Sequence, residues 1–214
     1  MSELKLREEI VAVAQAIDKA GFCPSKSGNV SARFGNGLLI TPSGLPYAQT
    51  KAEDLIHLSL DGAVLSGKRK PSSEWPFHIE IYRARPDAQA IVHTHSPRAT
   101  ALSSARRGIP AFHYMIALCG GADVRCADYA TFGSPELAAN AVRALEGRKA
   151  VLLANHGVIA LGASLAGAHT IVAEVENLAG QYLDLLASRL EPVILDAAEM
   201  ERVSAKFAGY GKVG

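Results

Sequence analysis

Long apolar runs are absent from this chain of 214 residues, and so is an ordered set of cysteines. The N-terminal segment MSELKLREEIVAVAQAIDKAG carries charges throughout and lacks the continuous apolar stretch of a signal peptide or a membrane span. The three cysteines (Cys23, Cys119 and Cys126) have no CxxC spacing and form no even-numbered disulfide framework. We therefore expect a cytoplasmic protein with reduced thiols and no membrane partner, in which a metal site would use histidine and carboxylate ligands.

An excess of charge of either sign is also missing. The chain has 22 basic and 21 acidic residues, a formal net charge of +1, and no long basic block. The short cluster GKRKP at 67–71 is typical of a solvated loop. Nucleic acid and anionic membranes are therefore not expected as main partners. A hydrophobic fraction of 49% and a charged fraction of 20% are those of an ordinary globular protein.

Helix-like and strand-like segments alternate along the chain, which predicts a single α/β domain over residues 1–214. Apolar spacing predicts a first helix that Gly21 ends, and capped or proline-started helices follow. These later helices are expected over 72–85, 97–108, 134–147, 164–190 and 196–211. Strands are expected over 29–34, 37–41, 55–60, 90–96, 149–157 and 158–162. Because the early strands come in hairpins, we expect three layers, with a central mixed, largely antiparallel sheet covered by helices.

Two local caps are predicted from short motifs. Thr50 with Glu53 matches a capping box, and a serine in PSSEWP is expected to cap the helix that contains Pro76.

Two histidines, His93 and His95, lie two positions apart in the apolar segment IVHTHS. Side chains at i and i+2 of a strand face the same side, so both imidazoles could bind one Zn²⁺ at roughly 2.0–2.1 Å. Taken alone, the pair fits a solvated strand face equally well. His156 ends another apolar strand in LLANHG, where a turn histidine is the alternative interpretation. Together the three histidines match the ligand set of a catalytic zinc centre.

Glu74 is the candidate carboxylate of this centre. It lies at the start of a predicted helix, where the helix dipole favours a negative charge. A glutamate beside such a metal could be a ligand, a general base, or both in turn. An ordinary first-turn acid is the alternative. His78, one turn further on, could also approach the metal, but we expect a packed and hydrogen-bonded helix histidine.

Three small-residue loops could bind a phosphate group: SGN at 27–29, PSG at 42–44 and SS at 72–73. Each offers backbone N–H groups with hydroxyl or amide donors, which is a phosphate cradle without a P-loop lysine. Each loop alone is ordinary turn sequence. The phosphate hypothesis therefore requires that all three loops meet near the metal.

A resemblance to a known family follows from motifs that span nearly the whole chain. SGNVSAR, ITPSGLPY, KPSSEWPFHIEIYRARPDAQAIVHTHSP, IPAFHYMIA, CADYATFGSPEL, LLANHGVIA and KFAGYG resemble the class II aldolase/adducin superfamily. They look most like its L-fuculose-1-phosphate aldolase branch. The resemblance implies a zinc-dependent lyase that cleaves a ketose 1-phosphate, such as L-fuculose 1-phosphate, reversibly to dihydroxyacetone phosphate and a small aldehyde such as L-lactaldehyde. It also implies one Zn²⁺ per subunit, with other divalent metals possible, and a homotetramer with active sites at subunit interfaces.

The resemblance also implies a role for individual residues. His93, His95 and His156 would hold the metal, and Glu74 would be the fourth ligand until substrate displaces it and it becomes the acid/base. Tyr114 would donate a proton to the aldehyde oxygen from the neighbouring subunit. The phosphate ligands implied are Gly28, Asn29, Ser43, Gly44, Ser72 and Ser73. The aldehyde pocket implied is walled by Phe132, Phe207 and Tyr210.

Other functions stay open at this point. Relatives on this scaffold include a 4-phospho-sugar-acid decarboxylase, a pentulose-5-phosphate 4-epimerase and a methylthioribulose-phosphate dehydratase, although HYMIALCGG and KFAGYG favour the aldolase. A non-catalytic adducin-like module would have lost the ligands that are kept here. Ser43 stands where threonine is common, and Asn155 precedes the third histidine where the family varies. Lysines at 51, 68, 70, 149 and 206 lie in polar contexts, so no Schiff-base lysine is expected.

Overall fold

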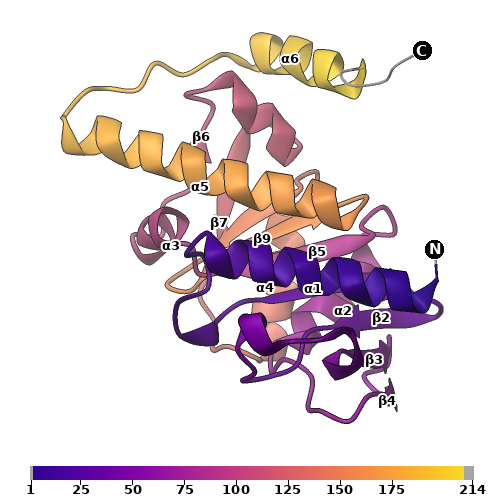
Figure 1. Ribbon diagram of the computed structural model, residues 1–214. Coiled ribbons are helices and arrows are strands. Elements are labelled where there is room, and N and C mark those ends of the chain that lie inside the picture. Colours follow the sequence, from indigo (N-terminus) through magenta and orange to yellow (C-terminus); the bar gives the residue numbers. More distant parts are fainter. Residues whose placement is uncertain (1, 210–214) are drawn as a thin grey trace.

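A single nine-stranded sheet forms the centre of the structure, a computed structural model that describes residues 2–209 (Figure 1). The strands are β1 (Asn29–Phe34), β2 (Gly37–Ile40), β3 (Ile56–Ser59), β4 (Val64–Ser66), β5 (Ala90–Thr94), β6 (Ile109–Pro110), β7 (Asp123–Ala127), β8 (Ala150–Leu153) and β9 (Gly157–Gly162). Their order is β4-β3-β2-β1-β5-β9-β8-β7-β6, and among these described strands only β7 and β8 pair in parallel. The expected mixed, largely antiparallel sheet is confirmed.

Helices cover both faces of the sheet. One face carries α1 (Glu3–Lys19), α3 (Pro97–Ser104) and α5 (Leu165–Ala187), and the other carries α2 (Trp75–Ala84) and α4 (Pro135–Ala144). Successive residues of β5 serve the two cores in turn, because Ala90 and Val92 pack toward the first set and Ile91 toward the second. The C-terminal helix α6 (Ala197–Gly209) packs on the short 3-10 helix η4 (Tyr114–Cys119) (Figure 1).

The end of α1 is held against the strand that carries the histidine pair. Gly21 has φ +79°, and its N–H donates to the carbonyl of Asp18 at 2.9 Å. The N–H of Phe22 donates to the carbonyl of Ile17 at 2.9 Å, which completes a Schellman motif and confirms the predicted role of the glycine. The carbonyl of Phe22 then accepts the N–H of His95 at 3.0 Å. The helix end therefore supports the backbone of a candidate ligand.

Glutamate 176 of α5 supports the segment on the other side of the same histidine. Ser96 precedes α3 without capping it through its side chain. Instead the Glu176 carboxylate accepts the N–H groups of Arg98 and Ala99, each at 2.8 Å. A carboxylate at a helix N-terminus satisfies free N–H groups and interacts favourably with the helix dipole. The start of α3, directly after His95, is therefore anchored to α5.

Both predicted caps are wrong in detail. The Thr50 hydroxyl donates to the carbonyl of Pro46 at 3.1 Å, whereas the N–H of Lys51 donates to the carboxylate of Asp54 at 2.9 Å. The capping interaction thus lies one residue later than Thr50 and Glu53. At α2 the N-cap position is Glu74, which makes no side-chain cap, because its carboxylate is directed to two histidines. The strands β6 and β7 and the helix η4 were not predicted.

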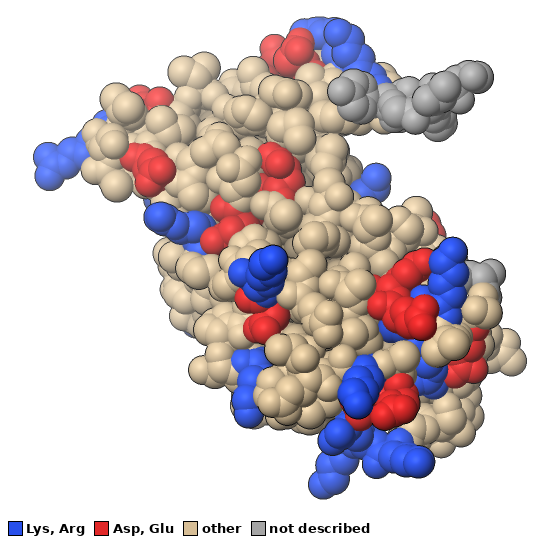
Figure 2. Space-filling model, in the orientation of Figure 1, with Lys and Arg blue, Asp and Glu red and all other residues tan. Residues whose placement is uncertain are grey.

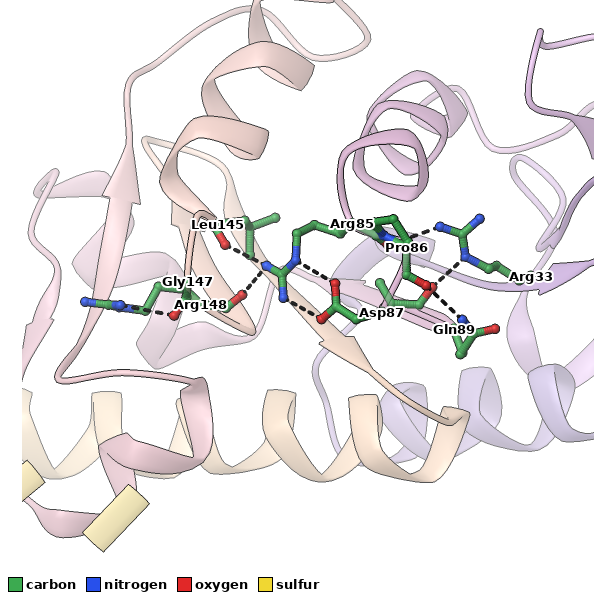
Figure 3. Close-up of polar contacts among 9 residues, drawn as sticks. Arg33, Arg85, Pro86, Asp87, Gln89, Leu145, Gly147 and Arg148 are labelled. Atoms are coloured by element: carbon green, nitrogen blue, oxygen red, sulfur yellow. Dashed lines mark hydrogen bonds and ion pairs between the residues drawn. The ribbon is translucent and has the colours of Figure 1, made fainter. Parts of the chain in front are cut away.

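Arginine side chains fix the turn between α2 and β5 (Figure 3). Arg85 donates to the carbonyls of Leu145 at 2.7 Å and Arg148 at 2.6 Å, and it pairs with the Asp87 carboxylate at 2.8 Å. Arg33 of β1 reaches the same turn and donates to the carbonyl of Arg85 at 3.1 Å. These contacts set the point at which the chain enters β5, the strand with the histidine pair.

We expect Arg85→Met to destabilise the protein by about 2–3 kcal/mol, because two carbonyls lose a charged donor in a largely buried place. Denaturant unfolding followed by circular dichroism measures the change. Arg83→Met is the matched control, because within residues 2–209 Arg83 forms ion pairs with the exposed acids Glu80 and Asp61 alone. Its loss should stay within about 0.5 kcal/mol. Equal losses in the two variants would contradict this role of Arg85.

Charged side chains of both signs are mixed over the face seen in Figure 2, where basic residues lie beside acidic ones. This distribution agrees with the formal net charge of +1. Within residues 2–209, no helix has the length and apolar character needed to cross a bilayer.

Candidate active site

Four side chains from separate elements meet at one end of the central strands. Glu74 comes from the start of α2, His93 from β5, His95 from the residue pair after β5, and His156 from the turn between β8 and β9. One potential ligand atom from each lies within 4.8 Å of the others. The Nε2 atoms of His93 and His95 are 3.0 Å apart, and Glu74 oxygens lie 3.2 Å from His93 Nε2 and 3.0 Å from His156 Nε2.

The ring of His93 is oriented by its other nitrogen. Its Nδ1 lies 2.9 Å from the carbonyl oxygen of Val158 on β9, which can only accept, so Nδ1 carries the proton. In the neutral ring Nε2 then presents a lone pair to the cluster, the arrangement typical of metal-binding histidines. Burial, and then the adjacent His93 and His156, lowers the pKa of His95 to about 3. His95 is therefore uncharged near pH 7, as metal binding requires.

Glu74 completes a donor set that fits a divalent cation. Burial raises the pKa of Glu74, but His93 and His156 lower it further, so that it falls well below its ordinary range. Its Oε1 is buried and, among the described residues, makes no hydrogen bond of good geometry, although it is 3.0 Å from His156 Nε2. Three imidazole nitrogens and one ionised carboxylate match the ligands that Zn²⁺ takes in proteins. The donor set does not select zinc over other first-row metals.

The three small-residue loops meet beside this cluster. A cavity of about 330 Å³ opens between them and the side chains of Glu74, His95 and His156. Its lining includes every residue implied as a phosphate ligand: Gly28, Asn29, Ser43, Gly44, Ser72 and Ser73. The second and third loops are tied together, because the N–H of Ser72 donates to the carbonyl of Thr41 at 3.0 Å and that of Ser43 to the carbonyl of Lys70 at 3.0 Å. The condition that the phosphate hypothesis set is therefore met.

Gly28 and Asn29 connect the first loop to the cluster. A Cβ on Gly28, which has φ +83°, would lie 2.6 Å from the carbonyl oxygen of His93, so only glycine fits there. The Asn29 side chain is buried and donates from Nδ2 to Glu74 Oε2 at 2.9 Å. His78 contacts Asn29 on its other side and stays outside the four-residue cluster, as predicted.

The aromatic residues implied for the aldehyde pocket, and Tyr114 implied as the proton donor, do not all line the cavity. Phe132 lines the cavity and is 67% exposed, which leaves its ring free to contact a substrate. Tyr114 is half-exposed and stacks on Phe207 with ring centroids 6.3 Å apart. Within the described chain neither of these two lines the cavity. Tyr210 lies outside the described residues.

The cavity lining also includes residues that were not predicted from the sequence as substrate ligands. Among them are Lys26, Tyr129 and Asn155. Asn155 has φ +55°, and its side-chain Oδ1 accepts from Arg106 at 3.1 Å, so it braces the turn that carries His156. Lys26 has φ +66° and is the one lysine or arginine among the described lining residues. The sequence feature that could have identified Lys26 is its position directly before the SGN loop.

Comparisons with known families and known proteins indicate the same family. The family described as "Class II Aldolase and Adducin N-terminal domain" matches residues 8–183. The chain is 49% identical over 210 residues to the 5-methylthioribulose-1-phosphate/5-deoxyribulose-1-phosphate aldolase of Rhodospirillum rubrum, covering 98% of this chain and 94% of that protein. It is 42% identical over 211 residues to the L-fuculose phosphate aldolase of Escherichia coli, covering 99% of this chain and 98% of that protein.

The fold comparison agrees. A solved structure of L-fuculose 1-phosphate aldolase superposes with a TM-score of 0.91 at 41% identity, and the match covers 95% of this chain and 96% of that one. Family, relatives and fold coincide with a cluster of donors suited to a metal. The chain belongs to the class II aldolase and adducin family and, like these relatives, is a class II aldolase, a metal-dependent lyase of sugar phosphates.

Proposed function

We propose that this aldolase cleaves the C3–C4 bond of a ketose 1-phosphate, reversibly, to dihydroxyacetone phosphate and a small aldehyde. The observation that carries the proposal is the single cavity that joins the Glu74–histidine cluster to the three small-residue loops. L-Fuculose 1-phosphate, with L-lactaldehyde as product, is one candidate substrate. The relative from Rhodospirillum rubrum supports 5-deoxyribulose 1-phosphate and 5-methylthioribulose 1-phosphate as further candidates. All three substrates share the phosphorylated three-carbon half and differ only in the aldehyde.

The phosphate group would bind in the three loops, at Gly28, Asn29, Ser43, Gly44, Ser72 and Ser73. These residues offer neutral donors and two glycines with positive φ, +83° at Gly28 and +72° at Gly44. Binding at this remote group holds the reacting carbons in place, so that its free energy supports the chemical step. The aldehyde end would contact Phe132, whose exposed ring suits a methyl or methylthio group.

A divalent cation held by His93, His95 and His156 would supply a Lewis acid for the negative charge that develops on the substrate oxygens. In the direction of bond formation, Glu74 removes a proton from the hydroxymethyl carbon of dihydroxyacetone phosphate. That carbon attacks the aldehyde carbonyl, and the aldehyde oxygen takes up a proton. We assign this second proton to Tyr114 of another copy of the chain, in a homotetramer. In cleavage both protons move in reverse.

A product assay on these substrates tests the proposal. The purified protein, loaded with Zn²⁺, is given each of the three ketose 1-phosphates, and dihydroxyacetone phosphate and the aldehyde are followed by mass spectrometry. We expect both products from at least one substrate, with loss of turnover on chelation and recovery on addition of Zn²⁺. An intact epimer, released CO₂, or full turnover after thorough metal removal would contradict it.

Lys26 should strengthen phosphate binding, because it places a positive charge at the cavity wall. No hydrogen bond or ion pair joins its ammonium group to another described residue. We expect Lys26→Gln to raise the KM of the phosphorylated substrate about two- to fivefold, the effect of one charge pair near the surface, with little change in kcat. Competition by inorganic phosphate should weaken in parallel. Lys5→Gln, on the exposed part of α1, is the control, and an unchanged KM in Lys26→Gln would refute the role.

A further inference from the structure

A row of hydrogen-bonded side chains runs behind the metal cluster, between β1 and α2. Glu74, His78 and Tyr82 are spaced four residues apart along the start and body of α2, so they share one side of the helix. Asn29 and Ser31 are alternate residues of β1 and face the helix together. None of the five is more than 7% exposed. The row is therefore closed to solvent except at its Asn29–Glu74 end, which borders the cavity.

Each neighbour in the row is in hydrogen-bond contact with the next. Tyr82 Oη lies 2.9 Å from Ser31 Oγ, and Ser31 Oγ lies 2.7 Å from His78 Nδ1. His78 Nε2 contacts Asn29 Oδ1, and Asn29 Nδ2 lies 2.9 Å from Glu74 Oε2. The row thus leads from a tyrosine hydroxyl to one oxygen of the carboxylate.

Only one assignment of donors satisfies every contact in the row. The Glu74 carboxylate can only accept, so the Asn29 amide must turn its NH₂ group toward it and its oxygen toward His78. His78 Nε2 must then carry a proton. Burial lowers the pKa of His78 to about 3, so the ring is neutral and its Nδ1 accepts from the Ser31 hydroxyl. Ser31 in turn accepts from Tyr82.

We propose that His78 is a positioning residue, which fixes the orientation of the Asn29 amide and, through it, the orientation of the Glu74 carboxylate. With the amide in this orientation, one N–H holds Glu74 Oε2, which also lies 3.2 Å from His93 Nε2, while Oε1 faces His156 Nε2 at 3.0 Å. The second N–H of Asn29 stays available on the cavity side, because Asn29 also lines the cavity. One amide therefore links the phosphate loop to the proton-transfer group.

A flipped amide would place its oxygen against the carboxylate, two acceptors facing each other in a buried site, which is strongly unfavourable. His78 adds to this preference, because its Nε2–H donates to the Asn29 oxygen and holds the amide in place. A residue that merely filled the volume of His78 would leave that buried oxygen without a donor, so the amide would be held by Glu74 alone. The role inferred for His78 rests on the proposed proton transfer by Glu74.

Solvent exchange at dihydroxyacetone phosphate isolates the step in question. In D₂O, without aldehyde, the metal-loaded protein should replace a proton of the hydroxymethyl carbon by deuterium, and NMR follows the rate. We expect His78→Leu to slow this exchange and kcat about 10–100-fold, the usual effect of losing a partner behind a metal ligand. KM should change by less than about threefold. Ser31→Ala, which removes only the donor to Nδ1, should slow exchange in the same sense by a smaller factor.

Tyr82→Phe is the matched control for stability. It removes one hydrogen bond from the same buried row, but Ser31 can still donate to His78, so the amide stays fixed. We expect its exchange rate to fall less than about threefold while its melting temperature falls as much as that of Ser31→Ala. If His78→Leu is folded and exchanges at the wild-type rate, the inference is overturned.

Nitrogen-15 NMR of histidine in the metal-free protein gives a readout independent of catalysis. The wild type and Ser31→Ala should both show His78 as the neutral Nε2–H tautomer, because the Asn29 oxygen that faces Nε2 can only accept. An Nδ1–H tautomer in the wild type would overturn the inference whatever the enzyme does. If the tautomer is as expected but no ketose 1-phosphate is cleaved, the proposed function fails and the amide orientation stands.

Discussion

Replacing His156 by alanine should abolish both tight metal binding and aldolase turnover. Its Nε2 is one of the four donor atoms that lie within 4.8 Å of one another, and the other three come from Glu74, His93 and His95. Removing one donor leaves two imidazoles and a carboxylate in a buried place with an open side. A bound metal would lower the free energy of the transition state by several kcal/mol, because it stabilises the negative charge that develops there. We therefore expect kcat/KM to fall by about 10³-fold or more.

Elemental analysis and turnover measure this prediction together. The wild type should carry a divalent metal through gel filtration in a chelator-free buffer, and His156→Ala should lose it. His169→Ala is the control, because it removes the same ring from α5, outside the cluster. A His156→Ala protein that keeps one metal per chain and the wild-type rate would refute the assignment.

Glu74→Gln should separate catalysis from binding. The amide has the shape of the carboxylate, so the loops and histidines can keep their places, but it cannot take up a proton. We expect kcat to fall about 10²–10⁴-fold, the usual contribution of a general base, while KM changes only a few-fold. Solvent exchange of dihydroxyacetone phosphate should fall by the same factor as kcat.

The control for Glu74→Gln is Glu80→Gln on the same helix. Glu80 pairs with Arg83 at the surface, at 2.6 Å, and touches none of the cluster. Its turnover should equal that of the wild type. If Glu74→Gln retained more than about a tenth of the wild-type kcat with metal bound, another group would have to carry the proton.

The candidate ligands could be predicted from the sequence because their signals are local. His93 lies in β5 and His95 directly follows that strand at spacing two, and the apolar run before them identifies a strand buried on both faces. His156 follows a similar run. These three needed only the period of a strand and the chemistry of zinc ligands. Glu74 was identified by its place at a helix start, although the expected serine cap of that helix was wrong.

The parts that could not be predicted depend on contacts between distant segments. Nothing in 27–29, 42–44 or 72–73 indicates that these loops meet, because the sheet order that brings them together is set by pairing of β1 with both β2 and β5. β7 was missed because Asp123 and Arg125 interrupt its apolar residues, and it pairs with the later strand β8. β7 is therefore a strand because it pairs with β8, although its own sequence pattern predicts a strand only weakly.

The hydrogen-bonded row behind the cluster could be predicted from the sequence only in part. His78 was expected to be a packed, hydrogen-bonded helix residue, and it is fully buried with partners on both ring nitrogens. Its partner Asn29 was assigned to phosphate alone. The second contact, to Glu74, depends on the register of β1 against β5, in which Asn29 lies opposite His93. The local periodicity of a sequence does not predict the register between two strands that lie about sixty residues apart.

Gly157 shows how packing can imitate a catalytic signature. A Cβ at this position would lie 2.4 Å from the carbonyl oxygen of Thr94 and 3.0 Å from the ring of His95. The residue after His156 is therefore restricted to glycine by the space that the end of β5 and the neighbouring imidazoles occupy. A role in the reaction is not needed to explain this glycine. The closest of these contacts is to a backbone oxygen, which remains when the histidine side chains are replaced. We therefore expect homologues that have lost their histidines to keep the glycine, so that the glycine alone does not indicate a metal site.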